Sequence, residues 1–304
     1  MPRSIRIAAV QAQPLPIGAP LDAFAADLNR VLKDSGGADL VLYPELHLFG
    51  SEEEAPERRN DLLRASAAPL DGPLVAGLGA IARGAGVWLV PGSVCELGPE
   101  GELFNTALVF SPHGELVASY RKVFPWRPYE PYDPGDHFVV FDIDGVGRFG
   151  LSICYDSWFP EVTRHLAWMG AEVVLNIVKT TTPDRAQELV LARANSIVNQ
   201  TFTASVNCAG PIGKGQSLIV GPDGEVLREL GDDRPGVIVE TIDLDAVSRI
   251  HEEGTAGLNR MWDQFLPTDP ALELPLYGGR IEPTRWNPTT APHPNSTSRQ
   301  DTSK

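Results

Sequence analysis

The chain has 304 residues, of which 42% are hydrophobic and 21% charged, and its net charge at pH 7 is −15. An acidic chain without a basic stripe argues against binding to nucleic acid or to an anionic membrane surface. Its three cysteines, Cys95, Cys154 and Cys208, are widely spaced, which excludes a disulfide framework and a paired-cysteine metal site. Together with the lack of a signal-like N-terminus or a long apolar run, this predicts a cytoplasmic protein.

Strand-like segments recur along the chain. They are rich in β-branched residues and are bounded by Gly, Pro or Asp. Several are continuously apolar, such as VVLNIV at 173–178, which favours strands that are covered on both faces. The expected strands are 5–10, 39–43, 87–94, 106–110, 138–143, 148–154, 172–178, 201–207 and 217–220.

Helical patterns lie between these strands. Residues 21–36 carry apolar side chains three and four apart and end on glycine. Residues 183–200 start with proline and aspartate, as helix N-termini prefer, and a third helix is expected from Pro160. Strands that alternate with helices predict a layered α/β fold. GPDGEV at 221–226 predicts a hairpin turn, and the Pro/Ser/Thr-rich C-terminal end predicts a mobile tail.

One glycine motif imitates a cofactor site. GLGAIA at 77–82 matches the Gly-x-Gly-x-x-Ala pattern of dinucleotide-binding folds, and Glu96 follows at a suitable distance. That fingerprint requires a strand directly before the first glycine, whereas the preceding residues APLDGPLVA are not strand-like. We therefore predict a helix with small residues that pack closely, and no bound dinucleotide.

Cys154 ends the strand-like run RFGLSIC, and a helix is expected to follow it. A side chain at this place lies in the crevice where α/β folds bind ligands. The N-terminus of a helix there would favour a thiolate or an oxyanion. The alternative is a buried structural cysteine, because cysteine is among the most buried residue types. Position alone leaves both interpretations open.

Two other segments place polar residues behind a strand. In LVLYPELHLFG, Glu45 follows an apolar strand, where a desolvated carboxylate could serve as a base or simply cap a turn. Lys122 follows a further strand-like segment in ELVASYRK, and a loop rich in Pro and aromatic residues then carries Glu130. Lys122 alone would be interpreted as a surface lysine. Lys179, behind another strand, is also expected to be an exposed lysine.

The segments YPE, YRK and CYD with FPE, taken in this order, resemble the nitrilase superfamily of carbon–nitrogen hydrolases. The resemblance runs from about residue 5 to residue 245 and includes NCAG at 207–210 and GQSLIVGPDGEV at 215–226. The stretch 120–136 is most similar to the aliphatic amidase and formamidase branch, whose lysine, tryptophan and second glutamate correspond to Lys122, Trp126 and Glu130.

The resemblance implies a four-layer α-β-β-α sandwich. The pattern of strands and helices decays from about residue 265, so we expect a carbon–nitrogen hydrolase domain at 1–265 and a C-terminal extension with a flexible tail at 266–304. Members commonly pair through helices, so we expect a homodimer or a larger homo-oligomer. The helices that begin near Pro160 and Pro183 are the candidates for this surface. The alternative is that both helices only cover a sheet within one subunit.

The resemblance also implies a mechanism. Cys154 would attack the carbonyl carbon of an amide and form a thioester, with Glu45 as the proton carrier. Lys122 and the backbone N–H of Tyr155 would hold the oxyanion, and Glu130 would orient the substrate and Lys122. The expected activity is the hydrolysis of a small or medium carboxamide to a carboxylic acid and ammonia, without a metal or an organic cofactor.

The substrate pocket is expected to include a group of aromatic and apolar residues, each of which could instead belong to the core: Tyr155, Trp126, Trp158, Leu46, Tyr129, Tyr132 and His47. Leu46 stands where aliphatic amidases carry a tyrosine, so the acyl pocket should be more apolar. The alternatives are an N-carbamoyl-amide hydrolase of the ureidopropionase type, a nitrilase or an acyltransferase. An inactive binding or scaffold member would not need the set of polar residues. The arginine pair that grips the carboxylate of N-carbamoyl amino acids is missing after Cys154.

Overall fold

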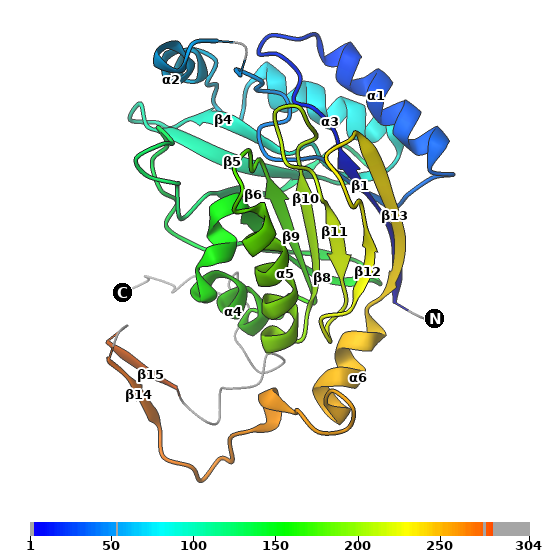
Figure 1. The fold of residues 1–304 in the computed structure, drawn as a ribbon, viewed down its shortest axis with the longest axis vertical. Coiled ribbons are helices and arrows are strands. Elements are labelled where there is room, and N and C mark those ends of the chain that lie inside the picture. Colours follow the sequence, from blue (N-terminus) through cyan, green and yellow to red (C-terminus); the bar gives the residue numbers. More distant parts are fainter. Residues whose placement is uncertain (1–2, 53, 276–277, 282–304) are drawn as a thin grey trace, which may run out of the picture.

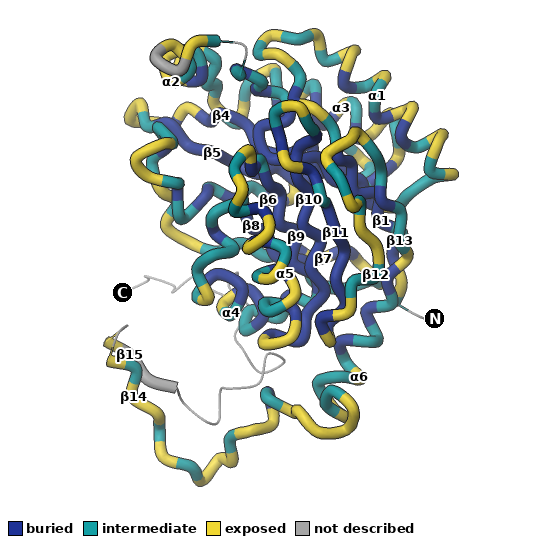
Figure 2. The backbone as a smooth tube through the Cα atoms, in the orientation of Figure 1, coloured by how far each residue is buried: buried dark blue, intermediate teal, exposed yellow. Residues whose placement is uncertain are grey.

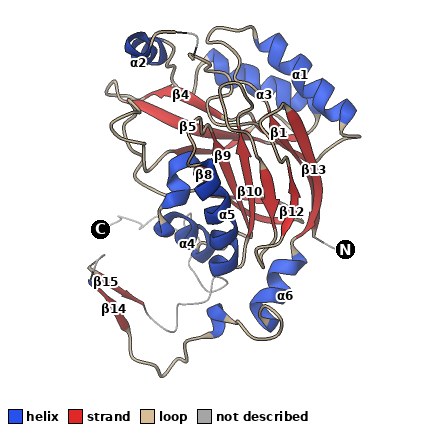
Figure 3. Ribbon diagram, in the orientation of Figure 1, coloured by secondary structure: helices blue, strands red, loops and turns tan. Residues whose placement is uncertain are grey.

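The computed structural model describes residues 3–52, 54–275 and 278–281 (Figure 1). Two β-sheets lie face to face, and helices cover the outer face of each (Figure 3). The predicted flexible tail falls mostly outside the described residues, so this tail and the domain boundary at residue 265 stay predictions. Of the helices that the structure describes, none is long and apolar enough to cross a lipid bilayer.

The two sheets contain parallel strands at their centres. The first has the order β13 (Gly236–Asp243), β1 (Ser4–Gln11), β2 (Leu40–Leu42), β3 (Trp88–Val90), β5 (Leu103–Phe110) and β4 (Ser93–Leu97), with β6 (Leu116–Arg121) also paired to β5. The second has the order β12 (Val226–Glu229), β11 (Leu218–Val220), β10 (Phe202–Asn207), β9 (Val173–Val178), β8 (Gly147–Ile153) and β7 (Val140–Ile143). Strands β1, β2 and β3 run parallel, as do β8, β9 and β10.

Side chains along each strand point alternately to the two faces of the sheet, and this alternation separates the layers of the core. In β1, Ile5, Ile7 and Ala9 point into the core between the sheets, whereas Ala8 and Val10 pack toward helices α1 (Leu21–Asp34) and α3 (Pro73–Ala85). Figure 2 shows that buried residues follow the strands of both sheets. The resemblance predicted this four-layer α/β fold, and the structure confirms it.

Helices α4 (Pro160–Trp168) and α5 (Arg185–Asn199) cover the second sheet (Figure 1). Both helices were predicted, α5 from the proline and aspartate before it and α4 as the helix that begins near Pro160. The hairpin at 221–226 is also confirmed, because β11 and β12 pair antiparallel across it. The remaining elements are α2 (Pro56–Ala65), α6 (Asp245–Glu253), β14 (Leu272–Leu274), β15 (Gly279–Ile281) and the 3₁₀ helices η1 (Cys154–Trp158) and η2 (Met261–Asp263).

The glycine motif at 77–82 lies within α3, as predicted. A Cβ on Gly79 would meet the carbonyl oxygen of Gly114 at 2.4 Å, so the helix packs directly against the turn between β5 and β6. The single strand predicted at 87–94 is wrong, because Pro91 and Gly92 divide it into β3 and β4. Gly92 has φ +94°, and a Cβ there would lie 2.0 Å from the carbonyl oxygen of Pro44. The break therefore makes room for the loop that carries Glu45.

Candidate active site

Three of the predicted residues lie just beyond the C-terminal ends of strands. Glu45 lies three residues beyond β2, Lys122 directly follows β6, and Cys154 directly follows β8. Glu45 and Lys122 come from the first sheet and Cys154 from the second. Because the sheets stack face to face, polar groups from both can meet at one edge, the usual position of a ligand site in such folds.

Lys122 holds two carboxylates together. Its side chain is fully buried, and Nζ lies 3.0 Å from Oε1 of Glu45 and 2.8 Å from both carboxylate oxygens of Glu130. Burial alone would lower the pKa of the Lys122 amine, but Glu45 and Glu130 raise it well above its ordinary value of 10.5. Lys122 is therefore a fixed cation at neutral pH.

Asn105 gives the two oxygens of Glu45 different roles. This residue of β5 faces Lys122 across the sheet, where the Lys122 N–H donates to its carbonyl oxygen at 2.9 Å. The Asn105 side chain donates from Nδ2 to Oε1 of Glu45 at 2.8 Å, the same oxygen that Lys122 contacts. Among the described residues both donors use Oε1, which leaves Oε2 to accept a proton. The sequence analysis missed Asn105, although a polar residue within the wholly buried strand LFNTALVF was a signal.

The loop after β6 positions Glu130. The Trp126 N–H donates to Oε2 of Glu130 at 2.8 Å, and the rings of Trp126 and Tyr129 lie 4.4 Å apart. Tyr129 is 65% exposed, whereas Tyr132 is buried and contacts Cys95 at 3.6 Å. Trp126 is therefore placed beside the carboxylates, and Tyr132 belongs to the core.

Cys154 sits on a strained turn. Its φ is +49°, which is rare for a residue with a side chain and carries a strain of about 1–3 kcal/mol. Asp156 holds the turn by accepting the N–H groups of Ile153 and Phe124, each at 2.9 Å, and the hydroxyl of Tyr120 at 2.8 Å. The partly exposed Cys154 is thus presented at the strand end and is not sealed in the core.

The charges around Cys154 favour the protonated thiol. Desolvation and the charge of Glu45 raise its pKa well above the ordinary value of 9.0, and Lys122 only partly opposes them. Since the thiolate is the nucleophilic form, a base must remove the proton during the reaction. Glu45 carries the carboxylate with the largest electrostatic effect on Cys154.

The other predicted pocket residues divide into two groups. Tyr155 and Trp158 lie in η1, directly after Cys154, partly exposed and with ring centroids 6.0 Å apart. Leu46 packs in the core between the first sheet and its helices, with φ +51°, and its N–H donates to the Ser93 hydroxyl at 2.9 Å. His47 is buried beside Phe24 and Tyr43, and burial lowers its pKa to about 4.

The expectation of an exposed Lys179 is wrong. Its side chain is only 10% exposed and forms an ion pair with Glu52. Glu52 comes from the loop beyond Glu45, so the pair joins segments that follow β2 and β9. The sequence could not reveal this partner, which lies in a loop that follows a strand of the other sheet.

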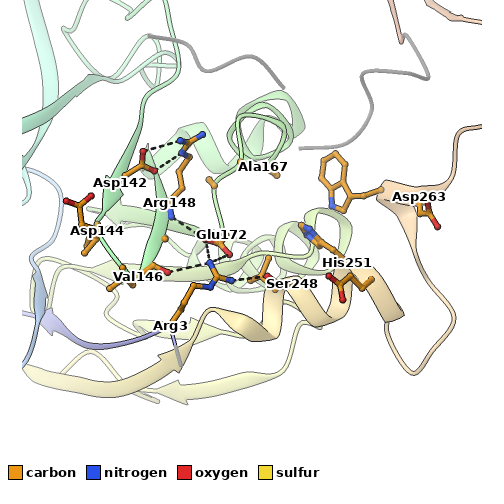
Figure 4. Close-up of a pocket in the computed structure, with 18 residues that line it drawn as sticks. Arg3, Asp142, Asp144, Val146, Arg148, Ala167, Glu172, Ser248, His251 and Asp263 are labelled. Atoms are coloured by element: carbon orange, nitrogen blue, oxygen red, sulfur yellow. Dashed lines mark hydrogen bonds and ion pairs between the residues drawn. The ribbon is translucent and has the colours of Figure 1, made fainter. Parts of the chain in front are cut away.

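Figure 4 shows a pocket, and none of the predicted site residues above lines it. Its volume is about 1130 Å³. It is lined by residues around the N-terminal ends of β1, β8 and β9, whereas Cys154 follows a C-terminal end. Arg3 pairs there with Glu172 and Asp245, each at 2.8 Å. These ion pairs connect β1, the start of β9 and α6, so we interpret them as structural.

Comparisons with known proteins show which family the chain is similar to. A family model described as carbon-nitrogen hydrolase matches residues 6–252. The formamidase of Pseudomonas syringae pv. tomato is 32% identical over 230 residues, which are 73% of this chain and 65% of that protein. The formamidase of Bradyrhizobium diazoefficiens is 34% identical over 66% of this chain and 58% of its own length. The chain thus spans about two thirds or less of the length of these relatives.

Solved structures of the nitrilase superfamily are also similar to this chain. Saccharomyces cerevisiae Nit3, a member of branch 10 of the nitrilase superfamily, superposes with a TM-score of 0.73 at 25% identity, covering 82% of this chain and 94% of Nit3. An amidase variant from Nesterenkonia sp. AN1 has a TM-score of 0.66 at 29% identity, covering 82% and 95%. In that structure the acetamide moiety of fluoroacetamide is covalently bound to the active-site cysteine.

Proposed function

Because the chain belongs to the carbon-nitrogen hydrolase family, we propose that it is an amidase that converts a small or medium carboxamide to a carboxylic acid and ammonia. The observation that carries the proposal is the buried contact of Lys122 with Glu45 and Glu130 within electrostatic range of Cys154. The formamidase and amidase relatives support the same activity.

Acylation begins with proton transfer. Oε2 of Glu45 takes the proton of the Cys154 thiol as the sulfur attacks the amide carbon. The carbonyl π electrons move to oxygen, and Lys122 and the Tyr155 N–H stabilise the resulting oxyanion. This N–H lies in the first turn of η1, where N–H groups lack partners within the helix. When the oxyanion collapses, the C–N bond breaks, and Glu45 protonates the departing nitrogen to give ammonia.

Deacylation repeats the same roles with water. Glu45 takes a proton from water as the water oxygen attacks the thioester carbon, and the same donors hold the oxyanion. The C–S bond breaks, the carboxylic acid leaves, and Glu45 returns the proton to sulfur. Glu130 positions Lys122 and transfers no proton in either half of the reaction. Both of its carboxylate oxygens lie 2.8 Å from Nζ of Lys122.

Helix α5 supports self-association. Val190, Ile197 and Val198 are exposed on it by 65%, 44% and 45%. We propose that α4 and α5 of two subunits pack together to form a homodimer or a larger homo-oligomer. We also place the enzyme in the cytoplasm, because its three cysteines are free and a nucleophilic thiol needs a reducing compartment.

Ammonia release from formamide, acetamide, propionamide and butyramide tests the activity. The protein should release ammonia from at least one of these amides, and short incubations should add the mass of the acyl group to Cys154. The Cys154→Ala variant should show neither effect. Full turnover by this variant would overturn the proposal. Hydroxamate formation with added hydroxylamine would show that the thioester is on the pathway.

A further inference from the structure

A second set of buried polar side chains approaches Cys154 from the loop after β9 and from helix α5. Strands β8 and β9 pair in parallel, with Ile153 opposite Ile177, so Cys154 and Thr180 leave the sheet at the same edge. The Cys154 sulfur and the Thr180 hydroxyl oxygen lie 3.9 Å apart. The backbone N–H of Thr180 donates to Oδ1 of Asn207 at 2.9 Å, which fixes this residue beside the sulfur.

The hydroxyl group of Thr180 donates its proton to a carboxylate. Its Oγ1 lies 2.8 Å from both carboxylate oxygens of Glu188, a residue of α5 that is only 5% exposed. A hydroxyl has one proton to donate and two lone pairs that accept. With its proton directed at Glu188, Thr180 can accept the S–H of Cys154 but cannot donate to a thiolate.

Glu188 is itself held in place. Arg185, one turn earlier in α5 and 1% exposed, donates from Nη1 to Oε2 of Glu188 at 3.1 Å. Its other donors bind the carbonyl oxygens of Gly215 at 3.1 Å and Gln216 at 2.9 Å, and the hydroxyl of Ser205 at 3.1 Å. The direction of the Thr180 hydroxyl is therefore set by a rigid, buried network that the reaction scheme above does not use.

We propose that Thr180, held by Glu188 and Arg185, is a positioning residue that fixes the Cys154 side chain as a thiol until an amide enters. This inference rests on the proposed function, in which Cys154 is the nucleophile. Charged groups act on the sulfur from two sides: Glu45, Lys122 and Glu130 on the side of the first sheet, and Glu188 and Arg185 on the side of α5. The two cations, Lys122 and Arg185, would promote a free thiolate, and the carboxylate of Glu188 opposes them. A resting thiol also resists oxidation and alkylation, which act on thiolates.

The test measures the reaction of Cys154 with methyl methanethiosulfonate from pH 6 to pH 10, followed by intact mass. The thiolate forms a methyl disulfide with this reagent, and methanesulfinate leaves. Cys95 and Cys208 are buried, and burial raises their pKa to about 11 and about 12, so Cys154→Ala reports the small background. Thr180→Val keeps the side-chain shape and the ion pair between Arg185 and Glu188, but it removes the hydroxyl. Thr180→Ser restores the hydroxyl, and Glu188→Gln removes the charge.

At pH 7.5 we expect Thr180→Val and Glu188→Gln to react about tenfold faster than the wild type, which corresponds to a drop of one unit in the pKa of Cys154. In both variants kcat for the amide should fall while KM changes little. Thr180→Ser should recover the wild-type rate of thiol modification and the wild-type kcat. Glu188→Gln leaves Arg185 without its anionic partner and can fail to fold, so Thr180→Val carries the test by itself.

A wild-type pH profile of methyl disulfide formation in Thr180→Val would overturn the inference, as would an equal loss of kcat in Thr180→Val and Thr180→Ser. These outcomes differ from a failure of the proposed function. In that case Cys154→Ala would keep its amidase activity, while the pH profiles of disulfide formation would still report on the thiol.

Discussion

The Nζ atom of Lys122 lies 3.0 Å from Oε1 of Glu45, although the two residues are 77 positions apart in the chain. Both side chains are almost completely buried. A buried ion pair of this kind is costly to desolvate, and removal of one partner leaves an uncompensated charge. This contact therefore links the stability of the fold to the arrangement of the site.

Lys122→Met should destabilise the protein by about 3–5 kcal/mol, because Glu45 and Glu130 then face each other without their cation. The loss of an oxyanion donor should also lower kcat by about 100- to 1000-fold. Urea unfolding and steady-state ammonia release measure the two effects. As a control, Lys122→Met combined with Glu130→Gln should regain stability but not activity. Unchanged stability in the single variant would contradict this role of Lys122.

Asn105→Leu removes the second donor to Oε1 of Glu45. A hydrogen bond to a charged group contributes about 1.5–3 kcal/mol, so kcat should fall by about 10- to 150-fold while KM changes little. The matched control is Asn199→Leu, which removes an equally buried asparagine at the C-terminal end of α5. The assignment fails if both variants lower kcat to the same extent.

Glu45, Lys122 and Cys154 each follow a strand, but this position alone left a structural interpretation open for all three. Only the resemblance of YPE, YRK and CYD, taken in order, predicted that they act together. Asn105, Thr180 and Glu188 escaped, since their partners depend on strand register and on the stacking of two sheets. Glu188 is an instructive case. Three residues after Arg185 on a helix, it has the spacing of an ordinary surface ion pair. The structure buries both side chains against the second sheet.

Other differences also arise from long-range packing. The strand predicted at 87–94 was divided because Gly92 lies against the loop of Glu45, a contact that local propensity cannot reveal. Leu46 was expected to line the pocket from its place beside Glu45, but it packs in the core between the first sheet and its helices. Residues in turns are placed by tertiary contacts, so their environment is harder to predict than that of strand residues.

Gly92→Ala should displace the Glu45 loop. The new Cβ would lie 2.0 Å from the Pro44 carbonyl oxygen, and φ is +94°. Gly86→Ala is a matched control, because its φ is +68° but nothing lies within 4 Å of the new Cβ. The control should cost only backbone strain of about 1–2 kcal/mol and keep kcat. Gly92→Ala should cost more and lower kcat at least tenfold. If Gly92→Ala and Gly86→Ala lost equal amounts of unfolding free energy and of kcat, the steric argument would be refuted.

Asp156 should make stability depend on pH. Burial raises the pKa of its carboxyl from 3.8 to about 6, although Lys122 and its hydrogen bonds oppose the shift. Between these two pH values the folded state binds more protons than the unfolded chain, so stability falls as the pH rises through this window.

In the Asp156→Asn variant the amide at this position does not titrate, so the variant lacks this pH-dependent contribution to stability. The stability of the wild type relative to the variant should therefore fall by about 2 kcal/mol between pH 4 and pH 7, since one pKa unit is 1.36 kcal/mol and pH 4 already lies above the unfolded pKa. Urea unfolding of both proteins at several pH values measures the difference. A difference that stays constant, or that moves in favour of Asp156 as the pH rises, would contradict the raised pKa.

Val190→Asp should disrupt the proposed contact through α5. Val190 and Ile197 are seven residues apart, so they share one face of the helix, and Val190 is the more exposed, at 65%. A stable interface buries about 1,200–2,000 Å² in total, and a carboxylate near its centre would lose its hydration without gaining a partner. Light scattering should show the wild type as a dimer or larger assembly and Val190→Asp as a monomer. Leu258→Asp, on a residue that is 77% exposed outside α4 and α5, should leave the assembly intact. A monomeric wild type, or the same dissociation in both variants, would exclude α5 as the interface.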